Sequence, residues 1–131
     1  MNINGSKILS ELTEVNNQLN TSDIYKLIDL IDISNHIYLT GAGRSGLMIR
    51  SFANRLLHLG YNISVVGEIS SPHTHPGDLL LISSGSGETI QPMGTLFEQY
   101  TLILYDSIVL NIMGLKNQTN ETMKARHANL E

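Results

Sequence analysis

Two short turns rich in glycine and serine are the parts of this chain best suited to chemistry. They are G-A-G-R-S-G at Gly41 to Gly46 and S-G-S-G-E-T at Ser84 to Thr89, and each follows an apolar run typical of a buried strand. Glycine-rich turns can direct several backbone N–H groups at one anion, and serine and threonine hydroxyls add donors with little bulk. The pair of turns therefore predicts a site for the phosphate group of a small molecule, such as a sugar phosphate.

Each turn also has a plainer interpretation, as a tight connection between a strand and a helix. The carboxyl ends of parallel strands meet at one edge of a sheet, and open α/β sheets bind their ligands at that edge. Two such turns, each after an apolar run, therefore favour the phosphate site. A nucleoside triphosphate loop would need a lysine after its last glycine, and neither turn contains one.

Apolar spacing predicts helices alternating with strands along the chain. Helical spacing occupies the first 31 residues, residues 48–59 and residues 93–113, whereas runs that favour strands occupy 36–40, 62–66 and 79–83. A polar connection at 116–120 leads to a short terminal helix that includes His127. This alternation favours a parallel sheet covered by helices on both faces.

The composition indicates one domain over residues 1–131, with N-terminal helices in 1–34, a phosphate-binding part in 35–90 and C-terminal helices in 91–131. Charged residues make up 15% of the chain, against roughly a quarter in an average soluble protein, which suggests that other subunits of a homo-oligomer cover part of the surface. A net charge of -4 without basic runs argues against a nucleic-acid or membrane partner. Without a long apolar run or a secretory signal, we expect the cytoplasm.

Several segments resemble the 6-phospho-3-hexuloisomerase family of the sugar isomerase (SIS) superfamily. They are I-Y-L-T-G-A-G-R-S-G, V-V-G-E, G-D-L-L-L-I-S-S-G-S-G-E-T, Q-P-M-G-T-L-F-E-Q and the terminal R-H-A-N-L-E. The resemblance implies a three-layer α/β/α domain of flavodoxin-like type and conversion of 3-hexulose 6-phosphate to fructose 6-phosphate, in formaldehyde fixation by the ribulose monophosphate route. It also implies no metal, no organic cofactor and a homotetramer.

The same resemblance implies roles for particular residues. Glu98 matches the family's catalytic base, and His127 is similar to a histidine that assists ring opening or proton transfer, often in a neighbouring subunit's site. Moving a carbonyl from carbon 3 to carbon 2 needs such a base and stabilisation of an enediol. The residues expected to contact the substrate or its phosphate are Gly43, Arg44, Ser45, Ser84, Ser86 and Thr89.

Each of these roles has a structural alternative. Glu98 follows Leu96 and Phe97 and could be a polar position on an apolar helix, although a buried carboxylate without a partner would be costly. His127 could be a solvated terminal histidine. Arg44 could contact sugar hydroxyls or the enediolate, or could pair with an acid.

The remaining histidines suggest no metal site. His73 and His75 form an H-x-H pair, but the prolines around them favour a loop, and no third ligand lies nearby in the sequence. His36 and His58 fall at the ends of predicted elements and are interpreted as structural. Glu68 follows the second strand and either lines the pocket or is exposed.

The chain departs from the family after the second turn. There, family members have a helix, a strand, a helix and a further strand before Q-P-M-G, whereas here Ile90 runs directly into Gln91. We therefore expect a sheet of about three strands, with 79–83 as an exposed apolar edge and Glu98 displaced from its family position. Two functions follow: a cofactor-free isomerase, or a sugar-phosphate-binding module that kept the turns but lost catalysis.

Overall fold

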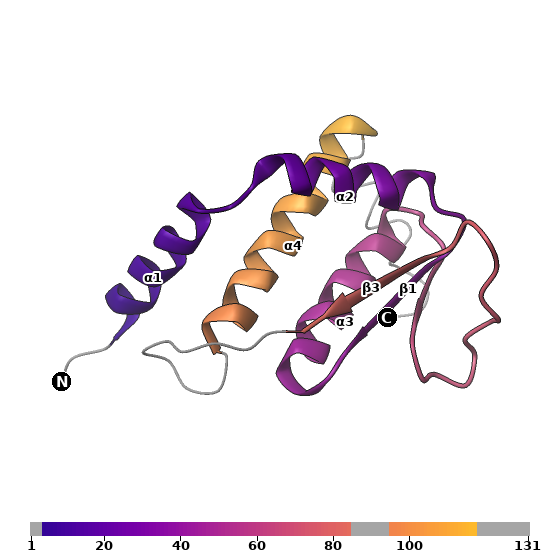
Figure 1. Cartoon of the computed structure of the whole chain (residues 1–131), viewed down its shortest axis with the longest axis horizontal. Coiled ribbons are helices and arrows are strands. Elements are labelled where there is room, and N and C mark those ends of the chain that lie inside the picture. Colours follow the sequence, from indigo (N-terminus) through magenta and orange to yellow (C-terminus); the bar gives the residue numbers. More distant parts are fainter. Residues whose placement is uncertain (1–3, 85–94, 118–131) are drawn as a thin grey trace.

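The structure is a computed structural model and describes residues 4–84 and 95–117. Two N-terminal helices precede a strand, a helix, two further strands and a long helix (Figure 1). Their bounds are α1 Gly5–Asn17, α2 Thr21–Ile33, β1 Ile37–Gly41, α3 Gly43–His58, β2 Ile63–Val65, β3 Leu79–Ser83 and α4 Thr95–Leu115. The predicted terminal helix around His127 lies outside the described residues.

The three strands form one parallel sheet in the order β2-β1-β3. Ile37 at the start of β1 pairs with Ile63 on one side and with Leu79 on the other. A parallel sheet with flanking helices confirms the predicted α/β class. Because β1 is central, the turn that follows it lies beside the end of β3.

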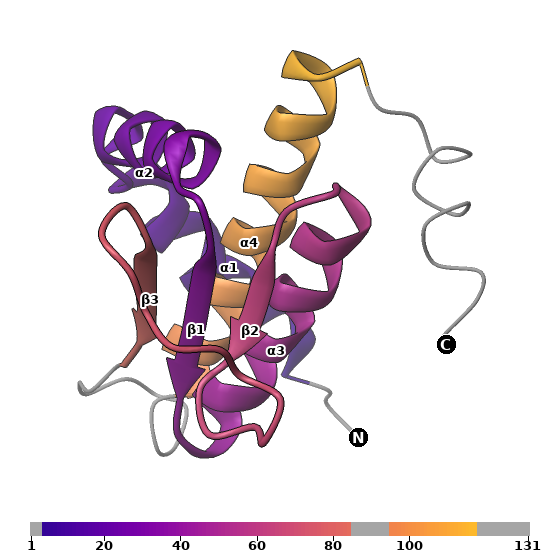
Figure 2. The same ribbon diagram turned by 90° about the vertical axis from the view of Figure 1, so that its right-hand side faces the viewer.

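The hydrophobic core lies between one face of this sheet and the helices. Successive residues of a strand point to opposite faces, and Ile37 and Leu39 of β1 point to the same one. They belong to one buried cluster with Phe52 and Leu56 of α3 and Ile108 of α4. Figure 2 shows α3 and α4 on this side of the sheet. Their packing fixes where the first turn of each helix lies.

The opposite face of the sheet carries a loop instead of a helix among the described residues. Residues 66–78 cross this face between β2 and β3 (Figure 2). The hydroxyl of Tyr38 donates to this loop and lies 3.1 Å from the carbonyl oxygens of both Pro72 and His73. On β3, Leu80 and Ile82 are 53% and 65% exposed. The structure thus confirms β3 as an apolar edge strand within the described part of the chain.

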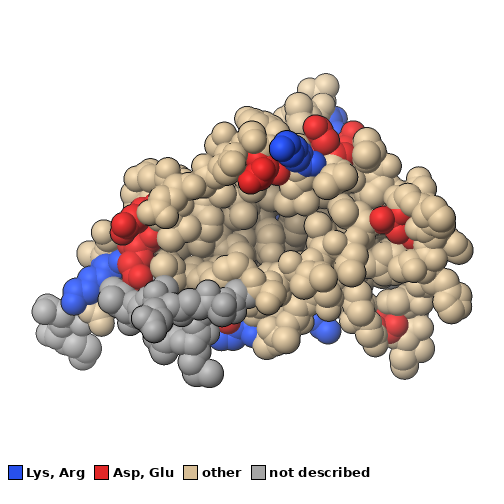
Figure 3. All heavy atoms as spheres, viewed as in Figure 1, with Lys and Arg blue, Asp and Glu red and all other residues tan. Residues whose placement is uncertain are grey.

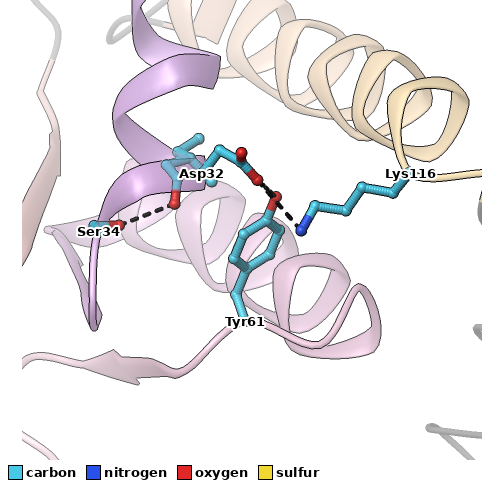
Figure 4. A network of polar contacts seen from close by, with 5 residues as sticks. Asp32, Ser34, Tyr61 and Lys116 are labelled. Atoms are coloured by element: carbon cyan, nitrogen blue, oxygen red, sulfur yellow. Dashed lines mark hydrogen bonds and ion pairs between the residues drawn. The ribbon is translucent and has the colours of Figure 1, made fainter.

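A polar clamp joins three elements at the end of the sheet where β1 begins. We use this term for Asp32 near the end of α2, Tyr61 after α3 and Lys116 after α4 (Figure 4). The Tyr61 hydroxyl donates to Asp32 Oδ1 at 3.2 Å, and Lys116 Nζ lies 3.3 Å from the same oxygen. The ammonium also sits 4.5 Å from the centroid of the Tyr61 ring. The clamp anchors the C-terminal end of α4.

The observed helix ends differ from those that the apolar spacing predicts. Apolar periodicity predicts the third helix from Met48, but α3 begins at Gly43, because its first turn is polar and covers the end of the sheet. At α2, the side chain of Asn20 accepts hydrogen bonds from the backbone N–H groups of Ser22 and Asp23, which fixes the start of the helix.

No helix in residues 4–84 or 95–117 combines the length and apolar character required to cross a membrane.

Candidate active site

The first glycine turn joins β1 directly to α3 and requires glycine for two different reasons. Gly43 has a φ of 56°, in the left-handed region that favours glycine. Gly46 packs against the strand end so closely that an added Cβ would lie 2.5 Å from the carbonyl oxygen of Gly41. The backbone N–H of Gly46 donates to Ala42 at 3.1 Å and starts the helix. The first turn of α3, with Arg44 and Ser45, is thereby held at the edge of the sheet.

The second turn begins beside the first one. Ser83 at the end of β3 pairs with Gly41, and an added Cβ on Gly41 would lie 3.1 Å from the Ser83 carbonyl oxygen. Ser84 follows and is exposed. The strand ends therefore meet at one edge, as the sequence predicts. The expected contacts Ser86 and Thr89 lie outside the described residues.

Glu98 is brought to the same region by the first turn of α4. The residue is buried, with 7% exposure. Its Oε2 lies 2.8 Å from Nε of Arg44, whose side chain is 58% exposed, against 10% for Glu98. Because Oε2 accepts no well-directed hydrogen bond in the described structure, this contact is an ion pair alone. Of the possibilities that the sequence left open for Arg44, the structure shows pairing with an acid.

Packing between α3 and α4 sets up the pair. Both helices begin at the carboxyl edge of the sheet and run side by side (Figures 1 and 2). Further along them, Phe52 of α3 stacks on Tyr105 of α4, with ring centroids 4.5 Å apart and planes inclined by 8°. Glu98 lies two helical turns before Tyr105 and so faces the same way. Aromatic stacking thus positions the carboxylate against the first turn of α3.

Two polar residues near this edge were missed by the sequence interpretation. Ser83 is 4% exposed, and neither its Oγ nor Oε1 of Gln99 has a well-directed hydrogen bond in the described residues. Burial raises the pKa of Tyr105, and an interaction with the Ser83 side chain opposes this rise. A serine that ends an apolar strand just before a serine-rich turn was the available signal for Ser83. Nothing in the sequence pattern distinguishes Gln99.

The other sequence candidates are distributed over several elements and loops of the structure. His36 is held by Ser64, with 2.8 Å between Nε2 and Oγ, and His58 is buried in α3. His73 and His75 belong to the exposed loop between β2 and β3, and Glu68 is exposed at its start. Within the part of the chain that the structure describes, no three His, Asp or Glu residues are grouped so that they could hold a metal ion. His127 lies outside that part.

The parallel sheet, the two neighbouring strand ends and the glycine turn after β1 define an α/β domain of the sugar-isomerase type. No family model matches the chain. It is 35% identical to a 3-hexulose-6-phosphate isomerase of Bacillus subtilis, with 96% of each chain covered, and 32% identical to one of Methylomonas aminofaciens, with 95% of this chain and 96% of the relative covered. The chain therefore belongs to the 3-hexulose-6-phosphate isomerase family, a family of enzymes.

A solved structure supports the same assignment. It is a Methanococcus jannaschii protein whose structure was taken to infer a molecular function of 3-hexulose-6-phosphate isomerase. The two structures have a TM-score of 0.77 and the chains are 25% identical, with 96% of each covered.

The first turn also has the G-x-G-x-x-G spacing of dinucleotide-binding motifs, so the glycine pattern by itself fits two kinds of ligand. Family membership, rather than this pattern, favours a sugar phosphate.

The comparison also bears on the length of the chain. The alignment with the Bacillus subtilis relative spans 178 residues, although this chain has 131. The relative therefore carries a substantial segment with no counterpart here, in agreement with the predicted internal deletion. The predicted position of that deletion, after Thr89 and Ile90, lies outside the described residues.

Proposed function

We propose that this chain binds a hexulose 6-phosphate and interconverts 3-hexulose 6-phosphate and fructose 6-phosphate. The observation that carries the proposal is the buried carboxylate of Glu98, 2.8 Å from the Arg44 guanidinium, at the edge where both turns begin. Open α/β sheets bind ligands at this edge, and the relatives' names supply the substrate.

The proposed chemistry is a proton transfer through an enediol. Glu98 removes the proton from carbon 2 of the 3-hexulose and returns it to carbon 3, while the hydroxyl proton at carbon 2 moves to the oxygen at carbon 3. A carboxylate largely shielded from water is suited to this role. Backbone N–H groups in the first turn of α3, with Ser45, Ser84, Ser86 and Thr89, would hold the phosphate. His127 would assist ring opening.

The reaction needs no external oxidant or reductant, because carbon 2 is oxidised as carbon 3 is reduced within the same substrate. That it also proceeds without a metal or organic cofactor is a prediction that comes with the family. A place in formaldehyde fixation, a cytoplasmic location and a homotetramer are further predictions that come with the family. A sparsely charged surface supports the oligomer: in Figure 3, uncharged residues cover most of the visible face, and the few charged side chains lie mainly toward its outline.

Replacing Glu98 tests the assignment of the base. We expect Glu98→Gln to reduce turnover of 3-hexulose 6-phosphate by about 100-fold or more, which is the usual contribution of a positioned general base. Glu14→Gln on α1 removes an exposed carboxylate and serves as the matched control, with turnover unchanged. Conversion to fructose 6-phosphate measures both. A fully active Glu98→Gln protein would rule out Glu98 as the base.

The second candidate function is a sugar-phosphate-binding module without catalysis. It is favoured by the exposed edge strand β3 together with the segment that the Bacillus subtilis relative has in addition. In that case fructose 6-phosphate raises the melting temperature of the unmodified chain, but no turnover is detected. Turnover by the unmodified chain excludes this alternative, and absence of both effects excludes both functions.

A further inference from the structure

Arg44 lies between two anions if the proposed function holds. On one side is the carboxylate of Glu98, with Nε of Arg44 2.8 Å from Oε2. On the other is the phosphate group expected at the first turn of α3, the turn to which Arg44 itself belongs. Arg44 thus contacts a buried internal anion and belongs to the turn at which the anion of an arriving substrate is expected.

The difference in burial between the two partners shows which of them can move. Glu98 is confined to the interface of α3 and α4, with its side chain 10% exposed, whereas the side chain of Arg44 is 58% exposed. Oε2 accepts no well-directed hydrogen bond from Arg44, so the contact holds the guanidinium by charge and not by fixed geometry. Arg44 can therefore turn toward a second anion while Glu98 stays in place.

We infer that Arg44 is a positioning residue that couples anion binding to release of the Glu98 carboxylate. Without substrate, Arg44 neutralises the buried carboxylate. When a phosphate monoester binds at the turn, it competes for the same guanidinium, and the ion pair with Glu98 weakens. Two anions that compete for one cation oppose each other's binding by a coupling free energy, and this coupling is reciprocal. The inference rests on the proposed function for the identity of the arriving anion.

Binding of inorganic phosphate and of fructose 6-phosphate to four proteins tests this coupling: the unmodified chain, Glu98→Gln, Arg44→Gln and the double variant. Once the charge of Glu98 is removed, Arg44 no longer pairs with it and can pair with the bound ligand. We therefore expect Glu98→Gln to bind both ligands on the order of tenfold more tightly, which is within the usual range of such couplings. Arg44→Gln should bind more weakly. In the double variant, the gain from Glu98→Gln should disappear, because the cation that carried it is absent.

The outcomes separate this inference from the proposed function. Equal phosphate affinity in the unmodified chain and Glu98→Gln, or an undiminished gain in the double variant, would overturn the coupling even in an active isomerase. Conversely, if the four proteins show the expected affinities but the unmodified chain has no turnover, the coupling is supported and the proposed isomerase activity is contradicted. A gain with fructose 6-phosphate but not with inorganic phosphate would mean that Arg44 faces the sugar and not the phosphate, which also overturns the inference.

Arg44→Lys provides a second test that does not depend on Glu98 variants. A lysine keeps the charge but presents it at a single point. It can therefore pair with the carboxylate or with the phosphate, but it lacks the extended planar set of donors of a guanidinium. We expect KM to stay within a few-fold of the original value and kcat to fall at least tenfold. A variant whose kcat is unchanged would show that the charge alone suffices, and would contradict the positioning role.

Discussion

The two ends of α4 carry ion pairs that look similar but have different physical character. At the N-terminal end, Glu98 is buried against Arg44, whereas at the C-terminal end the partners Asp32 and Lys116 have side chains that are 57% and 37% exposed. Water stabilises each partner of the exposed pair separately, but it has little access to the carboxylate of the buried one. The burial of the carboxylate in the first pair fits the role proposed for Glu98, whereas the exposed pair of the clamp is suited to anchoring the helix.

The largest difference should come from one glycine near each ion pair: Gly46 in the first turn of α3, close to Arg44, and Gly114 near the end of α4, close to Lys116. An Ala at Gly46 would bring its Cβ 2.5 Å from a backbone oxygen, whereas the position of Gly114, near the end of α4, has no contact within 4 Å. We expect Gly46→Ala to lower the free energy of unfolding by about 3 kcal/mol. Gly114→Ala should raise it by about 0.5 kcal/mol, since alanine favours a helix. Urea denaturation measures both, and equal effects would contradict the close packing at the turn.

Neutral replacements of Arg44 and Lys116 test the difference between the two ion pairs. Arg44→Gln leaves a buried carboxylate without its compensating charge, and we expect the free energy of unfolding to fall by about 1–2 kcal/mol, moderated by the exposure of Arg44. Lys116→Gln should cost about 0.5 kcal/mol or less. Added salt should reduce the second effect more than the first. A larger loss at Lys116 would reverse the ranking of the two pairs.

Alkaline pH gives the smallest expected effect and concerns the clamp. Burial raises the pKa of Tyr61 above its ordinary value of 10.0, so the folded state retains the phenol proton where the unfolded chain loses it. Burial lowers the pKa of Lys116, but the contacts with Tyr61 and Asp32 outweigh this effect, so its net shift is also a rise. Stability from both groups is therefore complete below about pH 10 and is lost as the pH rises through the folded-state pKa values.

Tyr61→Phe isolates the tyrosine part of this loss. The ordinary tyrosine pKa lies between about pH 9 and pH 11. Over this range we expect the free energy of unfolding to fall less in Tyr61→Phe than in the unmodified chain. Tyr25→Phe, which removes a tyrosine that is 61% exposed, is the control and should leave the pH dependence unchanged. An unchanged profile in Tyr61→Phe would show that the clamp does not contribute.

Local sequence patterns predicted most of the fold because apolar spacing reflects burial directly. The strand expected at 79–83 is β3 with the same bounds, and the helix expected at 93–113 is α4 at Thr95–Leu115. The first turn of α3 was not recognised from periodicity, because its polar residues face the site instead of the core. Where a helix begins at a ligand site, apolar spacing marks only its later turns.

The ion pair of the candidate site could not be derived in this way. Arg44 and Glu98 are far apart in the sequence, and their contact depends on the stacking of Phe52 on Tyr105 and on the anchored far end of α4. The resemblance to the isomerase family supplied a role for Glu98 but left three possibilities for Arg44. The packing of α3 against α4 selects the carboxylate as its partner.

The central place of β1 also has a kinetic consequence. β2 and β3 each pair with β1 and not with one another, so neither can join the sheet before β1 is extended. Its pairing with β2 closes a shorter loop than its pairing with β3, and α3 can pack across the first pair as it forms. We therefore expect β1, α3 and β2 to make up the folding nucleus, with β3 and α4 docking later. On such a route the glycine turn after β1 forms early, and the carboxylate of Glu98 is one of the last groups to reach its place.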